Sequence, residues 1–172
     1  MYDFATYDAK GPAPGTLALW ERVRREWPGA RSLGIYVART IRGADRLSLH
    51  AEGRAVDVVP PQGARDRMAE WARSNAEVLG IQEIIVYETK RIWTSLRPRE
   101  GWREYRGPSA GLHHVHIGQH RKGAGIAPGG VDAAVLTATA RNIAEEQGFV
   151  WWHVGLAAAL AAGLYWHERK LT

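Results

Sequence analysis

The sequence predicts an α+β fold in which helices pack on a small antiparallel sheet, followed by a C-terminal helical extension. Three observations favour this class: apolar residues recur at helical spacing in two stretches, short runs of β-branched residues lie around them, and Gly or Pro ends most runs. The 172 residues suffice for one domain with a sizeable core. We expect an irregular segment at residues 1–15, the domain at 16–122, a linker at 123–130 and a helical tail at 131–172.

Two helices are predicted within the domain. Thr16 can cap the first, which ends before Pro28 and Gly29. The second spans residues 64–79, and Gly80 supplies its C-terminal stop. Their inward faces should be formed by Leu19, Trp20, Val23 and Trp27 in the first helix and by Met68, Trp71, Ala72, Val78 and Leu79 in the second.

Five short strands are predicted to build the sheet. They are expected at residues 32–39, 55–59, 84–87, 91–94 and 114–118. A turn joins the third strand to the fourth, and a long loop rich in Pro, Gly and Arg precedes the last one. This order of helices and strands is typical of an antiparallel sheet with helices packed on it.

The C-terminal stretch Phe149–Trp166 differs in kind from the domain. It is apolar apart from His153, has aromatic residues at both ends, and precedes a polar stop at residues 167–170. As a helix it would be about 27 Å long, close to the thickness of a bilayer core. We therefore expect a transmembrane helix at residues 149–166, and the alternative is a helix packed on the domain or on a partner.

The composition limits the chemistry that the chain can perform. There is no cysteine, which excludes disulfides, thiolate metal ligands and a Cys nucleophile. The net charge of +5 favours anionic partners such as nucleic acid, a membrane surface or an acidic wall polymer. The arginines are scattered, however, so a solvated basic surface is the simpler interpretation. Residues 1–15 lack an apolar core behind a basic start, so no secretory signal is expected there.

Histidine and aspartate occur in a pattern that suits a metal ion. A catalytic zinc typically has three ligands from His, Asp or Glu and keeps a fourth position for water. His50 and Asp57 could converge if the chain turns at Gly53. On a strand, His114 and His116 would share one face, so that one could bind the metal and the other could lie beside the water. A single histidine is more often structural, and only the conjunction favours a metal site.

The stretch Ser48-x-His50-x-x-Gly53-Arg54-Ala55-x-Asp57, followed by His114-x-His116, resembles the VanY-like D-alanyl-D-alanine carboxypeptidase family. This family contains zinc peptidases of peptidoglycan and includes an endolysin-like branch. The resemblance covers roughly residues 16–118. It implies a fold like that of hedgehog and D-Ala-D-Ala peptidases, and hydrolysis of peptide bonds in peptidoglycan stem peptides.

The resemblance also implies roles for individual residues. His50, Asp57 and His116 would bind Zn²⁺. His114 would activate the water or stabilise the oxyanion, and His113 is the second candidate for the base. Many relatives place a carboxylate shortly before the last ligand, whereas this chain has none between residues 105 and 118.

Three more residues are candidates for supporting the site. By the same resemblance, Ser48 would support it through hydrogen bonding. Arg39 or Arg42 would hold the substrate carboxylate, and their spacing does not decide between them.

Two other functions are compatible with the sequence. A non-catalytic zinc-containing wall-binding domain would keep the same ligands. A metal-dependent nuclease would suit the paired histidines and the basic charge, but it leaves the motif at residues 48–57 without a role. We therefore expect peptidoglycan peptides rather than nucleic acid as partners.

The expected location depends on the C-terminal stretch. Arg169 and Lys170 favour a cytoplasmic C-terminus, which would place the catalytic domain on the side that faces the cell wall. The alternative is a phage endolysin that is made in the cytoplasm and released at lysis. The sequence does not predict an oligomeric state.

Overall fold

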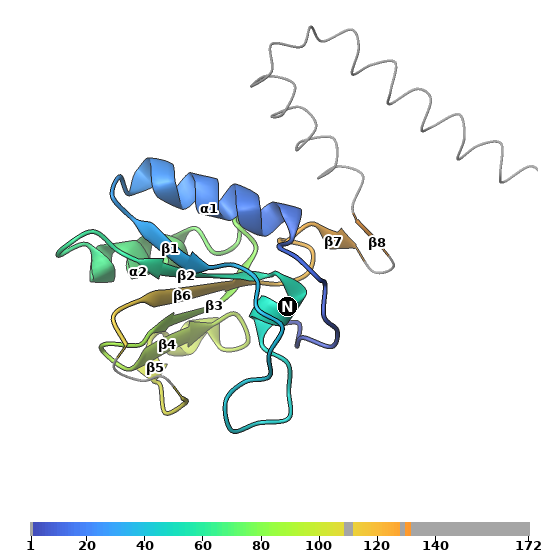
Figure 1. The fold of residues 1–172 in the computed structure, drawn as a ribbon. Coiled ribbons are helices and arrows are strands. Elements are labelled where there is room, and N and C mark those ends of the chain that lie inside the picture. Colours follow the sequence, from blue (N-terminus) through green and yellow to red (C-terminus); the bar gives the residue numbers. More distant parts are fainter. Residues whose placement is uncertain (1, 109–111, 128–129, 132–172) are drawn as a thin grey trace, which may run out of the picture. The chain divides into compact units, whose positions relative to one another are not determined.

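The computed structural model describes residues 2–108, 112–127 and 130–131 (Figure 1). The chain divides into two compact units, Met1–Val131 and Asp132–Thr172, of which only the first is described. Of the helical tail expected at residues 131–172, only Val131 is described, and it lies in a strand. The rest of the tail, including the membrane span expected at residues 149–166, lies outside the described residues. Among the helices within the described ranges, none has the length and apolar character needed to cross a membrane.

The described unit is α+β, as the sequence predicts. Its six-stranded sheet has the order β1-β2-β6-β3-β4-β5, and every neighbouring pair is antiparallel. The strands are β1 Arg31–Gly34, β2 Ala55–Val59, β3 Ile81–Val86, β4 Arg91–Thr94, β5 Arg103–Glu104 and β6 Val115–Gln119. A separate small hairpin joins β7 Ile126–Ala127 to β8 Gly130–Val131.

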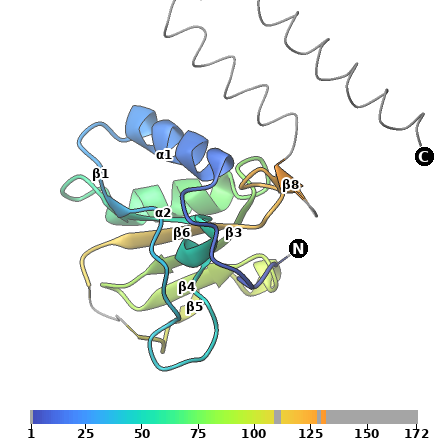
Figure 2. The same cartoon turned by 45° about the vertical axis from the view of Figure 1, so that its right-hand side comes forward.

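Two α-helices, α1 Pro14–Glu26 and α2 Arg65–Ser74, cover one face of the sheet. Short 3₁₀ turns lie at η1 Leu49–Glu52 and η2 Pro98–Glu100. The core between helices and sheet contains Leu19, Val23, Val56, Val58, Met68, Ala69, Ala72, Ile84, Val86, Val115 and Ile117. The loop between β1 and η1 extends on the side of the sheet away from α1 (Figure 2). The sheet therefore has one core face and one face that loops cover.

Both helices depart from the predicted boundaries. Helix α1 begins at Pro14 because proline is well suited to the first helical turn, and the Thr16 hydroxyl donates to Gln119 rather than capping the helix. Helix α2 ends at Ser74, where the Asn75 side chain donates to the Trp71 carbonyl. Val78 is 87% exposed, so its predicted inward position was wrong.

The first residues of the chain have no helix but are held firmly on the domain. The carboxylate of Glu52 is fully buried and accepts hydrogen bonds from the backbone N–H groups of Thr6 and Tyr7. The same carboxylate forms ion pairs with Arg54 and Arg121. These contacts fix the N-terminal segment against η1 and the end of β6.

The residues after β6 also pack on the domain. Ala124 is fully buried, and its carbonyl accepts a hydrogen bond from Gly15 N at 2.9 Å. A Cβ on Gly80 would lie 2.3 Å from the Gly123 Cα, so these two backbones are in close contact. The first residues of the expected linker at 123–130 therefore contact α1 and the start of β3.

Candidate metal centre

A tight turn places His50 on the loop-covered face of the sheet. Ser48 caps η1, because its hydroxyl accepts a hydrogen bond from His50 N at 3.3 Å. Gly53 ends the turn with a φ of 65°, a left-handed conformation that favours glycine. A Cβ at this position would lie 2.2 Å from the Gly11 carbonyl oxygen. Gly53 thus provides the turn that lets the chain pass from His50 into β2.

Strand pairing brings the other residues of the centre together. Asp57 on β2 lies directly opposite His116 on β6, and Glu83 on β3 lies opposite Gly118 on the other side of β6. A Cβ on Gly118 would be 2.5 Å from the Leu49 Cδ1 and 3.2 Å from the Glu83 Cγ. The glycine therefore leaves the space that these two side chains occupy beside His116.

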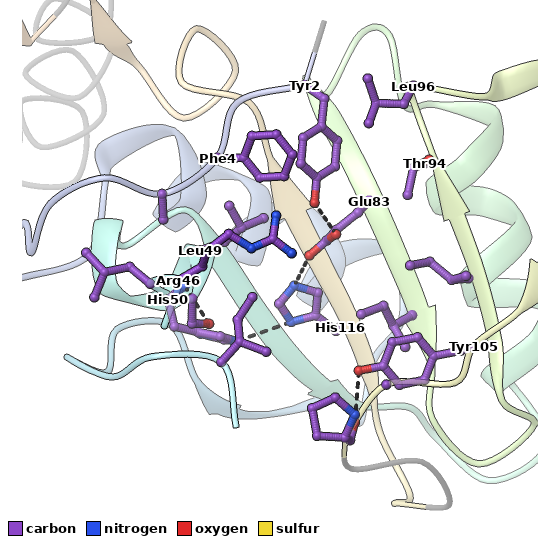
Figure 3. A pocket seen from close by; sticks show the side chains of 18 of the residues that line it. Tyr2, Phe4, Arg46, Leu49, His50, Glu83, Thr94, Leu96, Tyr105 and His116 are labelled. Carbon is purple, nitrogen blue, oxygen red and sulfur yellow. Dashed lines mark hydrogen bonds and ion pairs between the residues drawn. The ribbon is translucent and has the colours of Figure 1, made fainter. Parts of the chain in front are cut away.

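Three ligand atoms, from His50, Asp57 and His116, converge at this point of the sheet. Figure 3 shows the two histidines. His50 Nε2 lies 3.3 Å from Asp57 Oδ1 and 3.2 Å from His116 Nδ1, and the Asp57–His116 distance is 2.9 Å. Ligands about 2.0–2.1 Å from a tetrahedral zinc ion are separated by about 3.3 Å. The three side chains are 4%, 18% and 5% exposed, respectively. They form a group that could bind a metal ion.

Hydrogen bonds orient both imidazole rings toward this group. His50 Nδ1 lies 2.9 Å from the Ile35 carbonyl, which only accepts, so this nitrogen donates and Nε2 is left for a metal. His116 Nε2 lies 3.2 Å from the Glu83 carboxylate, which leaves Nδ1 for the metal. The second oxygen of Glu83 accepts a hydrogen bond from the Tyr2 hydroxyl at 2.5 Å. Such partners are typical of histidines that bind metals.

The electrostatics of the group also favour a cation. Burial opposes ionisation of Asp57, but hydrogen bonds with His116 and His50 hold its pKa well below the ordinary value. Burial alone would lower the pKa of His116. The hydrogen bonds to Asp57 and Glu83 outweigh this effect and raise the pKa to about 10. Without a metal, a proton on His116 supplies the positive charge between these acceptors.

His114 lies next to the three converging atoms. Its Nε2 is 3.6 Å from Asp57 Oδ2, too far for a hydrogen bond, and its ring centroid is 4.5 Å from that of Tyr87. Burial lowers the pKa of His114, an effect that the Asp57 charge only partly offsets. His114 therefore has a neutral imidazole beside the group, with a nitrogen that can accept a proton.

The family model of the VldE C-terminal domain matches residues 8–116. The chain belongs to this family. The matched range includes η1, β2 and β6 up to His116, and so contains His50, Asp57 and His116. No curated protein and no solved structure matches the chain.

In this member of the VldE C-terminal domain family, His113 is directed away from the centre. Its side chain is 84% exposed, and its Nδ1 lies 3.5 Å from Glu88 Oε2. Together with Glu88, it lines a separate cavity of about 400 Å³ near Pro60 and Pro61. The structure therefore brings His114, but not His113, to the three ligand atoms.

A cavity of about 560 Å³ opens over the centre and is lined by His50, Glu83 and His116. Its other walls combine aliphatic residues with the basic and aromatic residues Tyr2, Phe4, Arg39, Arg46, Tyr87, Arg97, Arg103 and Tyr105. Arg39 forms no side-chain hydrogen bond or ion pair with any described residue. Arg42 is exposed and does not line this cavity. Of the two candidates for holding a carboxylate, the structure therefore places Arg39 at the site.

Sequence reasoning did not identify Glu83 or Tyr2. Two adjacent polar residues, Gln82 and Glu83, stand among the apolar residues of Ile81–Val86, and this is a signal that could have drawn attention to Glu83. Tyr2 lies in an irregular segment without a motif, and no pattern in the sequence connects it to His116.

Proposed function

We propose that this chain is a zinc-dependent peptidase that hydrolyses peptide bonds in peptidoglycan stem peptides. The observation that carries the proposal is the convergence of His50, Asp57 and His116 at tetrahedral spacing, with His114 beside them and a basic cavity above. When bound, a zinc ion activates water at neutral pH and stabilises negative charge on a substrate carbonyl oxygen.

His114 is the proposed proton acceptor in hydrolysis. Its lowered pKa keeps the imidazole neutral near pH 7, and Nε2 has no hydrogen bond to any residue in the described ranges. Packing against the Tyr87 ring holds the imidazole in place. After accepting a proton at Nε2, His114 can return it to the leaving amine, as general acid–base catalysis requires.

The cavity suits a short anionic peptide. Its volume of about 560 Å³ lies within the range typical of small-molecule sites. Arg39, without an ion-pair partner among the described residues, can bind a substrate carboxylate, and Tyr105 and Tyr87 provide apolar surface for the peptide. The resemblance of the residue 48–57 motif to that of VanY-like carboxypeptidases supports stem peptides as the substrate.

A non-catalytic zinc domain that binds the cell wall is the second candidate. One observation favours it: Glu83, the nearest carboxylate besides Asp57 in the described part of the chain, is engaged by His116 and Tyr2. The centre therefore offers no free carboxylate as a base, and activity would depend on His114.

Digestion of purified peptidoglycan by the zinc-loaded full chain tests the proposal. Mass spectrometry of the muropeptides should show shortened stem peptides or opened cross-links with the wild-type protein and with His113→Ala, but not with His114→Ala. Zinc-loaded wild-type protein that binds peptidoglycan and releases no product would support the wall-binding domain instead. Nicking of plasmid DNA in the presence of magnesium would support the nuclease alternative.

Membrane association through residues 149–166 is a further part of the proposal, and it rests on the sequence alone. It would hold the peptidase domain near the wall. Recovery of the full chain exclusively in the soluble fraction after membrane fractionation would reject it.

A further inference from the structure

We propose that Tyr2, in the N-terminal segment of residues 2–8, is a positioning residue of the metal centre. The inference rests on the proposed metal-binding function and extends it to a part of the chain outside the ligand motif. It follows from a continuous chain of hydrogen bonds that runs from the segment to a ligand.

The chain of hydrogen bonds has three members (Figure 3). The Tyr2 hydroxyl donates to Glu83 Oε2 at 2.5 Å, and Glu83 Oε1 lies 3.2 Å from His116 Nε2. In the described part of the protein, the Glu83 carboxylate has no other hydrogen-bonding partner than these two side chains. Its side chain is largely buried, so loss of the Tyr2 hydroxyl would leave one carboxylate oxygen without a partner.

The position of Tyr2 is determined by the residue that precedes Glu83 on β3. Gln82 is fully buried, and its side-chain amide forms two hydrogen bonds with the backbone of Asp3: it accepts from Asp3 N at 2.7 Å and donates to Asp3 O at 3.0 Å. Because Asp3 follows Tyr2 and Gln82 precedes Glu83, this pair aligns the segment with the strand. The Tyr2 hydroxyl is thereby aimed at Glu83.

Further contacts anchor the segment at Tyr2 and at the two residues that follow it. The Tyr2 ring lies 5.1 Å from the Phe4 ring, and Arg46 lies over Phe4 at 5.0 Å. Arg54, which belongs to the ligand motif, donates to the Asp3 carbonyl at 2.9 Å. Arg54 of the motif at residues 48–57 therefore holds the N-terminal segment through Asp3. The segment in turn holds Glu83 against His116 through Tyr2.

The mechanism of positioning is geometric. A ligand histidine binds a metal well when its other nitrogen is held by a fixed partner, and loss of such a partner typically weakens metal binding by about 10- to 100-fold. With both oxygens engaged, Glu83 has one orientation relative to His116. Without the Tyr2 hydroxyl, the carboxylate can rotate about its side-chain bonds, and the His116 ring loses its fixed orientation toward Asp57.

The test compares two conservative variants of the full chain, Tyr2→Phe and Tyr7→Phe. Both keep the aromatic ring and remove one hydroxyl from the same segment, and the Tyr7 hydroxyl has no hydrogen bond to any described residue. We expect Tyr2→Phe to raise the zinc Kd by about tenfold or more and to change the visible absorption spectrum of the Co²⁺ form. Tyr7→Phe should retain the wild-type Kd and spectrum.

A double-mutant cycle identifies the route through Glu83. Glu83→Gln should weaken metal binding as well, and adding Tyr2→Phe to it should have little further effect, because both changes disrupt one chain of hydrogen bonds. Additive effects would overturn the proposed route.

The outcomes separate this inference from the proposed function. A Tyr2→Phe protein with the wild-type zinc Kd and Co²⁺ spectrum would overturn the role of Tyr2 and leave the peptidase proposal intact. Weakened metal binding in Tyr2→Phe, combined with a wild-type protein that hydrolyses no peptidoglycan, would support the role of Tyr2 and reject the peptidase. A wild-type chain that binds neither zinc nor cobalt would reject both.

Discussion

His116 Nδ1 lies 2.9 Å from Asp57 Oδ1 on the neighbouring strand, while Nε2 of the same ring lies 3.2 Å from Glu83 Oε1 on the opposite neighbour. The central strand β6 thus presents one imidazole to a carboxylate on each side. The Asp57 carboxylate belongs to the group that could bind a metal, and the Glu83 carboxylate orients the His116 ring. His116 therefore connects the group that could bind a metal, through Asp57, to the supporting carboxylate of Glu83.

Replacing His116 should therefore have a different effect from replacing His114. His116→Ala removes a ligand, so we expect zinc affinity to fall by more than the roughly 10- to 100-fold that loss of a supporting partner causes. His114→Ala should retain zinc and lower kcat by about 10²- to 10⁴-fold, the contribution typical of general acid–base catalysis. Zinc titration and turnover measured on the same samples separate the two effects.

His113→Ala is the matched control for both variants, because His113 pairs with Glu88 at a separate cavity. It should retain wild-type zinc affinity and turnover. Full activity of His114→Ala, or inactivity of His113→Ala, would contradict the assignment of the proton acceptor to His114.

Zinc binding should release a proton. The pKa of His116 is raised to about 10 in the metal-free protein, so at pH 7 the ring is protonated and must lose a proton before Nδ1 can bind a metal. Because the competing proton becomes scarcer as the pH rises, zinc affinity should increase by about tenfold per pH unit from neutral pH up to about 10. Calorimetric titrations in two buffers of different ionisation enthalpy would measure about one released proton, and equal heats in both buffers would contradict this prediction.

The fold class could be predicted from local patterns, and the converging ligands were expected from the resemblance of their motifs to those of VanY-like carboxypeptidases. The spacing of His114 and His116 places both on one side of a strand, and Gly53 marks the turn that carries His50 toward Asp57. These features depend on neighbours in the sequence, and for that reason they can be read from it. The same reasoning extended the second helix to Leu79, beyond its end at Ser74, because the apolar residues keep helical spacing into the turns that follow.

Glu83 and Tyr2 could not be predicted, because no motif marks them and they reach the centre only through contacts between distant segments. Glu83 reaches His116 only through the register of β3 on β6, and Tyr2 reaches Glu83 only because Gln82 holds the backbone of Asp3. The sequence likewise left Arg39 and Arg42 equivalent, since only the path of the loop before η1 directs one of them into the cavity.

The difference between Arg39 and Arg42 can be measured in substrate binding. If Arg39 binds a substrate carboxylate, Arg39→Ala should raise KM by about 10- to 100-fold, the range expected for loss of a hydrogen bond to a charged group, and change kcat less. Arg42→Ala is the matched control and should leave both constants unchanged. With substrates whose carboxylate has been amidated, the wild-type protein and Arg39→Ala should have the same KM. A KM that still differs would assign Arg39 another role.

Breaking the buried ion pair of Glu52 and Arg54 should destabilise the domain. Both side chains are fully buried, and Arg54 also donates to the carbonyls of Asp3 and Gln119. Arg54→Ala would leave a buried carboxylate with Arg121 as its remaining cationic partner, so the free energy of unfolding should fall by about 3–5 kcal/mol. Urea denaturation of the metal-free protein measures this change.

The exposed Arg67, which has no ion pair with any described residue, provides the control for that measurement. Arg67→Ala should change the free energy of unfolding by no more than about 0.5 kcal/mol. Similar stabilities of Arg54→Ala and Arg67→Ala would show that the motif arginine does not hold the domain together. Because Arg54 also binds the carbonyl of Asp3, its loss should release the segment that carries Tyr2, and proteolysis near residues 2–8 should become faster in Arg54→Ala than in Arg67→Ala.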